Sequence, residues 1–346
     1  MALTTETLTA TLVPYLDAPR WLVAYSGGVD SHVLLQLLTH VPNHPVIEAV
    51  HINHQLQADA NHWAGHCQQQ ADQLNIPLHT VAIDIDSQPK GSLEEQARDA
   101  RYQVFESLLQ PGDVLMMGHH LDDQVETLLL RLLRGSGVRG GSAMPQGRVL
   151  GNGLLLRPLL TIPRSVIESY ANAHQLQWIE DPSNQLSDFD RNFLRLQLLP
   201  IIAERWPEYR QTLSRTAALN EEAALLNTEL AQLDLVGLGL GEKGGLDSGA
   251  VGADSVLPLA GLHALSDSRK KNLLRYWLQV GGFALPSAAQ LQAVITDVIN
   301  AQPDAEPVVA WGNEVQVRRF NHCLYAMPPL AAIDKTLVAD WDLVGG

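Results

Sequence analysis

The sequence has few cysteines and no long apolar run, and both absences narrow the class of protein. Only Cys67 and Cys323 occur among 346 residues, and no CxxC pair is present. Two cysteines so far apart do not make a disulfide framework or a cysteine-based zinc site. No stretch of about 18 apolar residues is available to span a bilayer. The N-terminal segment also lacks the basic start and apolar core of a secretory signal. We therefore expect a cytoplasmic protein.

Basic residues are also scarce. The chain has 23 lysines and arginines against 38 acidic residues, a formal net charge of −15. This balance argues against a nucleic-acid partner, because phosphate binding requires cationic side chains. The charge is unevenly spread, however. Residues 131–215 contain 11 arginines and 7 carboxylates, a net charge of +4, which leaves −19 for the rest of the chain. The global charge therefore does not exclude a local contact with nucleic acid.

The first part of the chain alternates short apolar runs with amphipathic stretches. This pattern predicts βαβ units and a parallel sheet covered by helices on both faces. In such sheets, ligands bind beyond the carboxyl ends of the strands. The predicted strands are Trp21–Tyr25, Val46–Ile52, Leu78–Ile83 and Val114–Met117, and the helices between them are Ser31–His40, Ala58–Leu74 and Leu93–Leu109.

The later part of the chain predicts a second, smaller domain. A long helical pattern, Glu208–Leu233, precedes the glycine-rich window 237–255, which contains 7 of the 26 glycines and is typical of a linker. Beyond it we predict the helices Asp267–Leu278 and Ala288–Ile299. A pair of strands around Val308–Met327 then carries a Gly-Asn turn.

A short glycine-containing segment follows the first predicted strand. Ser26-Gly27-Gly28-Val29-Asp30-Ser31 stands between that strand and a helix. Two glycines allow a tight turn that presents backbone N–H groups, and the helix start adds partial positive charge. A Walker loop needs a lysine here, but the first lysine in the chain is Lys90. We predict an anion-binding loop of another kind. The alternative is a plain strand-to-helix turn in which Asp30 caps the helix.

Acidic residues follow the fourth predicted strand. Asp122, Asp123 and Glu126 have the spacing of one helix face. Their helix begins at the carboxyl edge of the sheet, where the anion-binding loop also opens. Two uncompensated acids beside a bound phosphate indicate a cation site, for Mg²⁺ or an amine substrate. An acidic first turn that complements the helix dipole is the alternative.

The histidines carry weaker signals. His119 and His120 are adjacent at the end of a strand, where successive side chains point in opposite directions. We therefore expect at most one of them to face the site. His62 and His66 are four residues apart on a predicted helix, but no glutamate completes an HExxH zinc motif. We predict that this pair lies on a polar helix face.

Four blocks of the sequence together resemble the tRNA(Ile)-lysidine synthetases, a family of the PP-loop ATP pyrophosphatases. Later segments, PSAAQLQ, DAEP and WGNEVQVRRFNHCLYAM, are similar to the second, substrate-binding domain of that family. The four blocks are SGGVDS at Ser26–Ser31, SLEEQARDARYQVF at Ser92–Phe105, HHLDDQVETLLLRLLRGSG at His119–Gly137, and the polar block of Asp181-Pro182-Ser183-Asn184 with Arg191, Asn192 and Arg195.

The resemblance implies an α/β fold with a defined domain order. Residues 1–215 would form a Rossmann-like PP-loop domain with a parallel sheet, of the adenine nucleotide alpha-hydrolase type. Residues 216–330 would form a smaller, mainly helical substrate-binding domain with a β hairpin. Longer members of the family have a third domain, so residues 331–346 are either the tail of a compact member or the start of a missing domain.

The resemblance also implies a reaction. Members of the family attach free L-lysine to the wobble cytidine of an isoleucine tRNA with a CAU anticodon, through an adenylated cytidine, and release pyrophosphate and AMP. The expected cofactors are ATP and Mg²⁺. The resemblance does not decide whether the protein forms a homodimer. The residues expected to bind ATP are Ser26, Gly27, Gly28, Val29, Asp30 and Ser31, with Asp30 as the metal ligand.

The same resemblance assigns roles to the acidic helix and the polar block. Asp123 and Glu126 would hold the substrate lysine and, with Asp30, act as the catalytic residues. Asn184 and Arg195 match the polar pair of the family, and an arginine is suited to bind a carboxylate or phosphate through two hydrogen bonds. Asp181 is expected to support this pair without contacting the substrate itself.

Arginines supply the predicted contacts to tRNA. Arg131, Arg134 and Arg139 lie on or beside a glycine-rich loop in the positive segment, and we predict that they contact the RNA backbone. Arg318 and Arg319 form a further candidate pair. Arg98 and Arg101 are expected to make ion pairs on a solvated helix face, with a phosphate contact as the alternative.

Three other functions use a similar loop. A PP-loop tRNA-thiolation enzyme usually needs a pair of reactive cysteines, which the spacing of Cys67 and Cys323 does not indicate. A small-molecule synthetase would not need the arginine-rich segment. A non-catalytic adenine-nucleotide-binding module would leave Asp123 and Glu126 without an evident purpose.

Overall fold

The computed structural model describes residues 3–53, 60–83, 93–181, 190–240, 256–302, 305, 307–312 and 314–329. The chain divides into two compact units, Met1–Glu222 and Ala223–Gly346. The predicted domain limits stay predictions, and residues 241–255 of the predicted linker and the tail 331–346 lie outside the described residues. Among the helices of the described residues, none is both long and apolar enough to cross a membrane.

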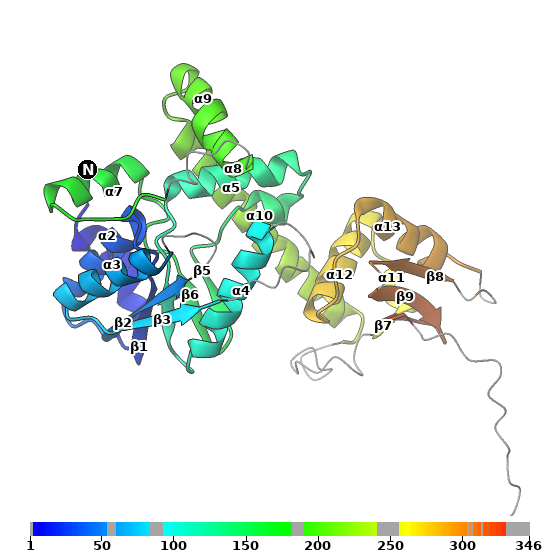
Figure 1. The fold of residues 1–346 in the computed structure, drawn as a ribbon. Helices are drawn as coiled ribbons and strands as arrows, with labels where there is room; N and C mark the ends of the chain where they lie inside the picture. Colours follow the sequence, from blue (N-terminus) through cyan, green and yellow to red (C-terminus); the bar gives the residue numbers. More distant parts are fainter. Residues whose placement is uncertain are drawn as a thin grey trace, which may run out of the picture. The chain divides into compact units, whose positions relative to one another are not determined.

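The first unit is built on a six-stranded, mostly parallel sheet with the order β3-β2-β1-β4-β6-β5 (Figure 1). The four predicted strands are confirmed. The sequence does not predict β6, which pairs in parallel with β4, or the antiparallel edge strand β5, because each is four residues long and lies in a glycine-rich stretch. The strands are β1 (Arg20–Ala24), β2 (Val46–Asn53), β3 (Leu78–Ala82), β4 (Val114–Met116), β5 (Gly147–Leu150) and β6 (Gly153–Leu156).

Different helices cover the two faces of this sheet. Trp21 and Val23 of β1 are fully buried on one face with side chains of α1, α2 and α7, whereas Leu22 is buried on the other face with Phe105 of α4. This alternation follows from the two-residue period of a strand. The helices are α1 (Thr5–Leu12), α2 (Val29–Thr39), α3 (Ala60–Gln73), α4 (Leu93–Leu108), α5 (Leu121–Leu133), α6 (Val138–Gly141) and α7 (Arg164–Ala173), with the 3₁₀ turn η1 (Val13–Tyr15).

A run of helices follows α7 and the undescribed residues 182–189. The segment η3 is a π-helical turn, a form that often occurs at functional sites. The predicted long helix is confirmed as α10, which contains the division between the two units. The run consists of α8 (Asp190–Phe193), η3 (Leu194–Leu198), α9 (Leu199–Arg205) and α10 (Tyr209–Gly237).

The second unit packs helices against an antiparallel sheet with the order β7-β10-β9-β8. Its core contains Leu274, Trp277 and Ile295 from helices and Val317 and Leu324 from strands. The elements are β7 (Val256–Pro258), α11 (Leu259–Leu262), α12 (Asp267–Val280), α13 (Ala288–Ala293), η4 (Val294–Ile299), β8 (Val308–Trp311), β9 (Val315–Phe320) and β10 (Cys323–Met327).

The predicted β hairpin belongs to a larger sheet, because the described residues of this unit form four strands. A second turn joins β9 to β10 at Asn321 and His322, which both have positive φ, 46° and 59°. Asn-His is not a usual sequence for such a turn, which favours Asn-Gly or Asp-Gly. The turn was missed for that reason, and β7 is only three residues long.

Candidate functional site

The anion-binding loop lies between β1 and α2. Gly27 has a φ of +84°, and a Cβ there would lie 2.8 Å from Cys67 Sγ and 2.9 Å from Ile179 Cδ1. Only glycine fits such a conformation in so little space. Gly28 is the N-cap residue of α2, so the loop ends directly at the positive end of a helix.

The two serines of the loop hold each other in place. The Ser26 and Ser31 hydroxyl oxygens are 3.1 Å apart, and the Ser26 backbone N–H donates to Ser31 Oγ at 3.2 Å. Ser31 Oγ in turn donates to the Gly28 carbonyl at 3.0 Å. The loop is thus organised by its own hydrogen bonds at the start of a helix. This is the geometry of an anion cradle.

Asp30 lies on the first turn of α2, beside this loop. Burial raises the pKa of its carboxyl, although the charges of His120 and Arg164 act in the opposite direction. Its Oδ1 atom is buried and has no hydrogen-bond partner among the described residues. A buried carboxylate oxygen without a donor fits a hard cation, and Mg²⁺ is commonly held by one or two carboxylates together with substrate phosphates. Asp30 can therefore hold Mg²⁺ bound to a nucleotide.

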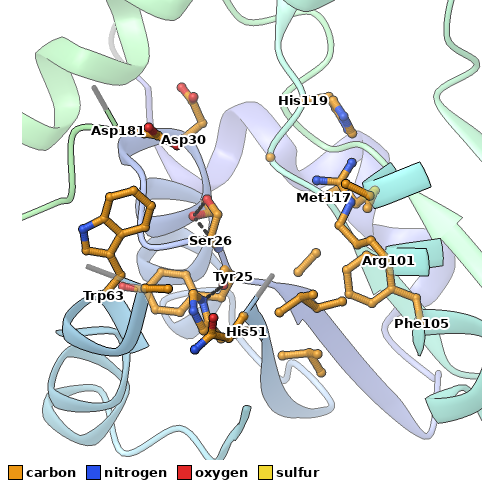
Figure 2. Close-up of a pocket in the computed structure, with 18 of the residues that line it drawn as sticks. Tyr25, Ser26, Asp30, His51, Trp63, Arg101, Phe105, Met117, His119 and Asp181 are labelled. Carbon is orange, nitrogen blue, oxygen red and sulfur yellow. Dashed lines mark hydrogen bonds between the residues drawn. The ribbon is translucent and has the colours of Figure 1, made fainter. Parts of the chain in front are cut away.

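A cavity of about 580 Å³ opens at the carboxyl ends of β1, β2 and β4. This volume lies in the usual range for small-molecule sites, roughly 300–1,000 Å³. In Figure 2, Trp63, Tyr25 and His51 lie on one side and Arg101, Phe105, Met117 and His119 on the other. The loop contributes Ser26, Asp30 and Ser31, and Asp181 also borders the cavity.

Most of the cavity wall was not predicted from the sequence. Trp63 occurs on α3 among polar residues, and the sequence pattern of α4 indicates only a core position for Phe105. Only the strand order brings α3 and α4 to the same cavity. The apolar and aromatic side chains there can contact flat rings, such as nucleotide bases.

The predicted acidic helix is α5, and its first turn is fixed by a capping box. His120 Nδ1 accepts a hydrogen bond from the Asp123 backbone N–H at 3.3 Å, and Asp123 Oδ2 accepts one from the His120 N–H at 3.0 Å. His120 Nε2 lies 3.7 Å from Asp30 Oδ1 and 3.4 Å from Asp123 Oδ2. One histidine thus joins the loop and the acidic helix.

His119 has a different position and borders the large cavity. Burial, together with the charges of Arg157 and Arg101, lowers the pKa of His119 to about 3, against the effect of Asp123. The prediction that at most one of the two histidines faces the site is wrong. His119 borders the cavity, and His120, which caps α5, also reaches Asp30.

The expectation of uncompensated acids is wrong. Glu126 is fully buried, and Arg195 donates to both of its oxygens, from Nε to Oε1 at 2.7 Å and from Nη2 to Oε2 at 2.9 Å. Arg195 Nη2 also lies 3.5 Å from Asp123 Oδ1, and Arg191 Nε lies 3.8 Å from Glu126 Oε2. Arg195 stands on the π-helical turn η3. The sequence could not reveal this pairing because 69 positions separate the two residues.

The pKa values of these acids move in opposite directions. Burial raises the pKa of Glu126 despite the two hydrogen bonds from Arg195. The pKa of Asp123 is lowered, because the charges of His120 and His119 outweigh the effect of burial. Asp123 is therefore the stronger acid of the pair.

The acids of α5 also border two different cavities. Asp123 faces the large cavity, whereas Asp122 and Glu126 line a second one of about 340 Å³. Opposite charges alternate in the second cavity. Arg210 Nε pairs with Asp122 Oδ1 at 2.5 Å, and Arg164 Nε pairs with Glu168 at 2.9 Å. The second cavity can therefore hold a small molecule that carries both charges.

The other predicted residues are more dispersed. Asn184 lies outside the described residues. Of the three arginines expected to contact RNA, Arg134 and Arg139 are exposed, and Arg134 pairs with Asp190 at 3.5 Å. Arg131 is half-buried and donates to the carbonyls of Gly140 and Ala143.

The remaining predicted pairs lie elsewhere. His62 is exposed, and His66 lies 3.3 Å from the Gln177 carbonyl oxygen. Arg318 is partly buried, and Arg319 donates to the Ala301 carbonyl.

Comparison with known proteins identifies the family. A family model described as a PP-loop domain matches residues 2–202, and one described as the TilS substrate binding domain matches residues 257–325. The tRNA(Ile)-lysidine synthase of Coxiella burnetii is 40% identical over 341 residues, which are 98% of this chain and 73% of that protein. The chain belongs to the tRNA(Ile)-lysidine synthase family.

Other relatives agree with this assignment. The tRNA(Ile)-lysidine synthase of Pseudomonas putida is 46% identical over 86% of this chain and 68% of its own length. The chain thus spans about two thirds to three quarters of these lysidine synthase relatives. Among solved structures, the U34-tRNA thiolase NcsA from Methanococcus maripaludis matches with a TM-score of 0.53 at 18% identity, over 63% of this chain and 78% of that one. That likeness shows a shared fold.

Proposed function

We propose that this chain joins lysine to the wobble cytidine of isoleucine tRNA with a CAU anticodon and consumes ATP in the reaction. One observation carries the proposal beyond family membership. His120 lies within 4 Å of both Asp30, next to the anion cradle, and Asp123 of the acidic helix. A nucleotide in the cradle and an amine held by the acids would therefore be neighbours.

In the first step, ATP would bind with its phosphates at residues 26–31, and Asp30 would hold a Mg²⁺ ion that neutralises phosphate charge. The cytosine carbonyl oxygen attacks the α-phosphate, a bond to that oxygen forms, and pyrophosphate leaves. The large cavity supports this step because Trp63 and Phe105 offer surfaces for flat rings. The step converts a poor leaving oxygen into a good one.

In the second step, the lysine ε-amine attacks the activated ring carbon and AMP leaves. The amine has to be neutral at the moment of attack, and a neighbouring carboxylate is expected to accept its proton. Asp123 borders the same cavity, although its lowered pKa makes it a weak base. Glu126 and Arg195 line the second cavity, where the other charges of lysine would bind. Asn184 is expected to assist them.

The RNA contacts and the place of the reaction complete the proposal. Arg134 and Arg139 are exposed and available to the tRNA backbone, and Arg131 shapes the adjoining glycine-rich loop through its bonds to two carbonyls. We place the reaction in the cytoplasm, with ATP, Mg²⁺, free lysine and tRNA as its components.

The thiolation alternative is not supported by the cysteines. Burial raises the pKa of the Cys67 thiol to about 12, so it stays protonated near neutral pH. Cys323 belongs to the other unit of the chain. No described pair of thiols is therefore available to carry sulfur.

Two substitutions test the proposed division of labour. We expect Asp30→Ala to abolish pyrophosphate release from ATP in the presence of the tRNA. Glu126→Gln should retain most of this release but lose lysine transfer, because it changes the amine side of the site only. Single-turnover assays with labelled ATP and labelled lysine separate the two steps. If both variants keep full turnover, the site is assigned wrongly.

A further inference from the structure

Four arginines surround Tyr102 at the edge of the large cavity. Arg98 and Arg101 come from α4, Arg148 comes from β5, and Arg157 follows β6. The guanidinium carbons of Arg98 and Arg148 lie 5.7 and 5.2 Å from the centre of the Tyr102 ring. Although burial raises the pKa of Tyr102, these four cations together lower it. We call Arg98, Arg101, Arg148 and Arg157 the arginine cluster.

Two members of this cluster, Arg148 and Arg157, are not balanced by described carboxylates. Among the side chains that the structure describes, no Asp or Glu oxygen lies within ion-pair distance of either guanidinium, in contrast to Arg195, which pairs with Glu126. The expectation that Arg98 makes an ion pair stays a prediction, because the side chains of Glu94 and Glu95 lie outside the described residues. Like charges gathered in one place repel each other unless an anion is present.

Arg157 is the most constrained member. It is 4% exposed, and its Nη1 donates to the Pro145 carbonyl at 2.7 Å. Its Nε is buried without a hydrogen-bond partner among the described residues. Burial, with Arg148 and Arg98 nearby, lowers the pKa of this guanidinium. A buried cation with an unused donor is costly, and an anionic ligand would offset that cost.

The cluster adjoins the cavity on the side away from the anion cradle. Tyr102 Oη donates to Met117 Sδ at 3.8 Å, and Met117 and Arg101 both border the cavity. In Figure 2, Arg101 and Met117 lie on one side of the cavity, and Ser26 and Asp30 lie on the other. Arg98 and Arg148 are exposed, so a large ligand can reach them.

We propose that the arginine cluster binds backbone phosphate of the single-stranded RNA that delivers its base into the cavity. This inference rests on the proposed function, because it names where that substrate's backbone is held. The ATP phosphates already have a cradle on the opposite side. Guanidinium groups bind phosphate through paired hydrogen bonds, and a single-stranded loop can turn one base inwards while its backbone stays at the rim.

The test uses the full chain and an RNA hairpin with the anticodon stem and loop of the tRNA. We compare the wild type with the double variant R98Q/R148Q, which changes exposed residues and leaves Arg157 in place. The dissociation constant, measured by fluorescence anisotropy, should rise about tenfold at moderate salt. The slope of log K against log salt should fall by about 0.7 for each single-strand phosphate that the variant no longer binds.

Two controls make the result specific. R205Q/R215Q removes the same charge from exposed positions of α9 and α10, and we expect a change of at most about twofold. R98K/R148K keeps the charge and should recover part of the affinity. Thermal unfolding checks that all variants are folded.

The outcomes separate this inference from the proposed function. If R98Q/R148Q binds the RNA as the wild type does, or if R205Q/R215Q loses as much affinity, the inference is overturned. A rise in the KM for ATP with unchanged RNA affinity also overturns it, because the phosphate would then be that of the nucleotide. A wild-type chain that binds the RNA but forms no lysidine contradicts the proposed function instead.

Discussion

At the scale of single residues, Gly118 is confined by backbone atoms near the proposed ATP site. A Cβ at this position would lie 3.0 Å from the backbone carbon and oxygen of Asp30 and 3.1 Å from the Ser31 nitrogen. Backbone atoms of a packed helix cannot move aside as a flexible side chain can. We therefore expect Gly118→Ala to displace the start of α2 and to lower kcat/KM for ATP by about tenfold or more.

Gly65 provides the matched control for this substitution. It lies on α3, and a Cβ at this position would meet nothing within 4 Å, so Gly65→Ala should leave ATP use unchanged. The free energy of unfolding should rise by about 0.5–1 kcal/mol, because alanine forms a helix more readily than glycine. Steady-state kinetics and urea unfolding measure both effects. Equal ATP kinetics in the two variants would contradict the account of Gly118.

The pH dependence of lysine use follows from Glu126. Because burial raises the pKa of this carboxyl, it takes up a proton at a higher pH than an ordinary glutamate. As the pH is lowered, kcat/KM for lysine should therefore begin to decrease at a pH above about 4, where an ordinary carboxylate would take up its proton. The measurement uses tRNA that is already adenylated. A decrease that begins only in the range of an ordinary glutamate would contradict this account of Glu126.

Some single residues of the site could be predicted and others could not. Ser26, Asp30, Asp123 and Glu126 stand next to strand ends, and a local motif marks each of them. The Arg195 partner of Glu126 and the position of Trp63 depend on contacts between distant segments. No spacing rule along the chain encodes such contacts.

At the scale of elements, the turn between β9 and β10 has a sequence that does not suit its conformation. His322 has a φ of 59°, where a side chain other than glycine is strained. We expect His322→Gly to raise the free energy of unfolding by about 0.5–1 kcal/mol, because glycine adopts this conformation without strain. Thermal or urea unfolding of the full chain measures the change.

His322→Ala is the control for this turn. Alanine removes the imidazole but keeps a Cβ, so it should give no such gain. If alanine stabilises the chain as much as glycine does, the imidazole and not the backbone conformation is responsible.

The elements themselves were predicted to different degrees. The strands β1 to β4 and the helices α2 to α4 have strong apolar patterns, and the sequence placed them within a few residues. The strands β5, β6 and β7 contain three or four residues each, too few for a period to show. The π-helical turn η3 has the same apolar spacing as an ordinary helix.

At the scale of the whole molecule, the net charge of −15 conceals local positive sites. The sequence count placed the positive charge in residues 131–215. The structure adds Arg98 and Arg101 to it, because α4 packs near β5 and the end of β6 and brings them to Arg148 and Arg157. A count along the chain cannot detect this grouping, since the two arginine pairs come from different elements.

The most direct test of the central claim is the transfer of radiolabelled lysine to isoleucine tRNA with a CAU anticodon, in the presence of ATP and Mg²⁺. The account predicts one lysine per tRNA, together with equal amounts of AMP and pyrophosphate. The same tRNA with uridine in place of the wobble cytidine should remain unlabelled. A chain that binds both ATP and the tRNA but transfers no lysine, or that labels the uridine tRNA equally well, would contradict the account.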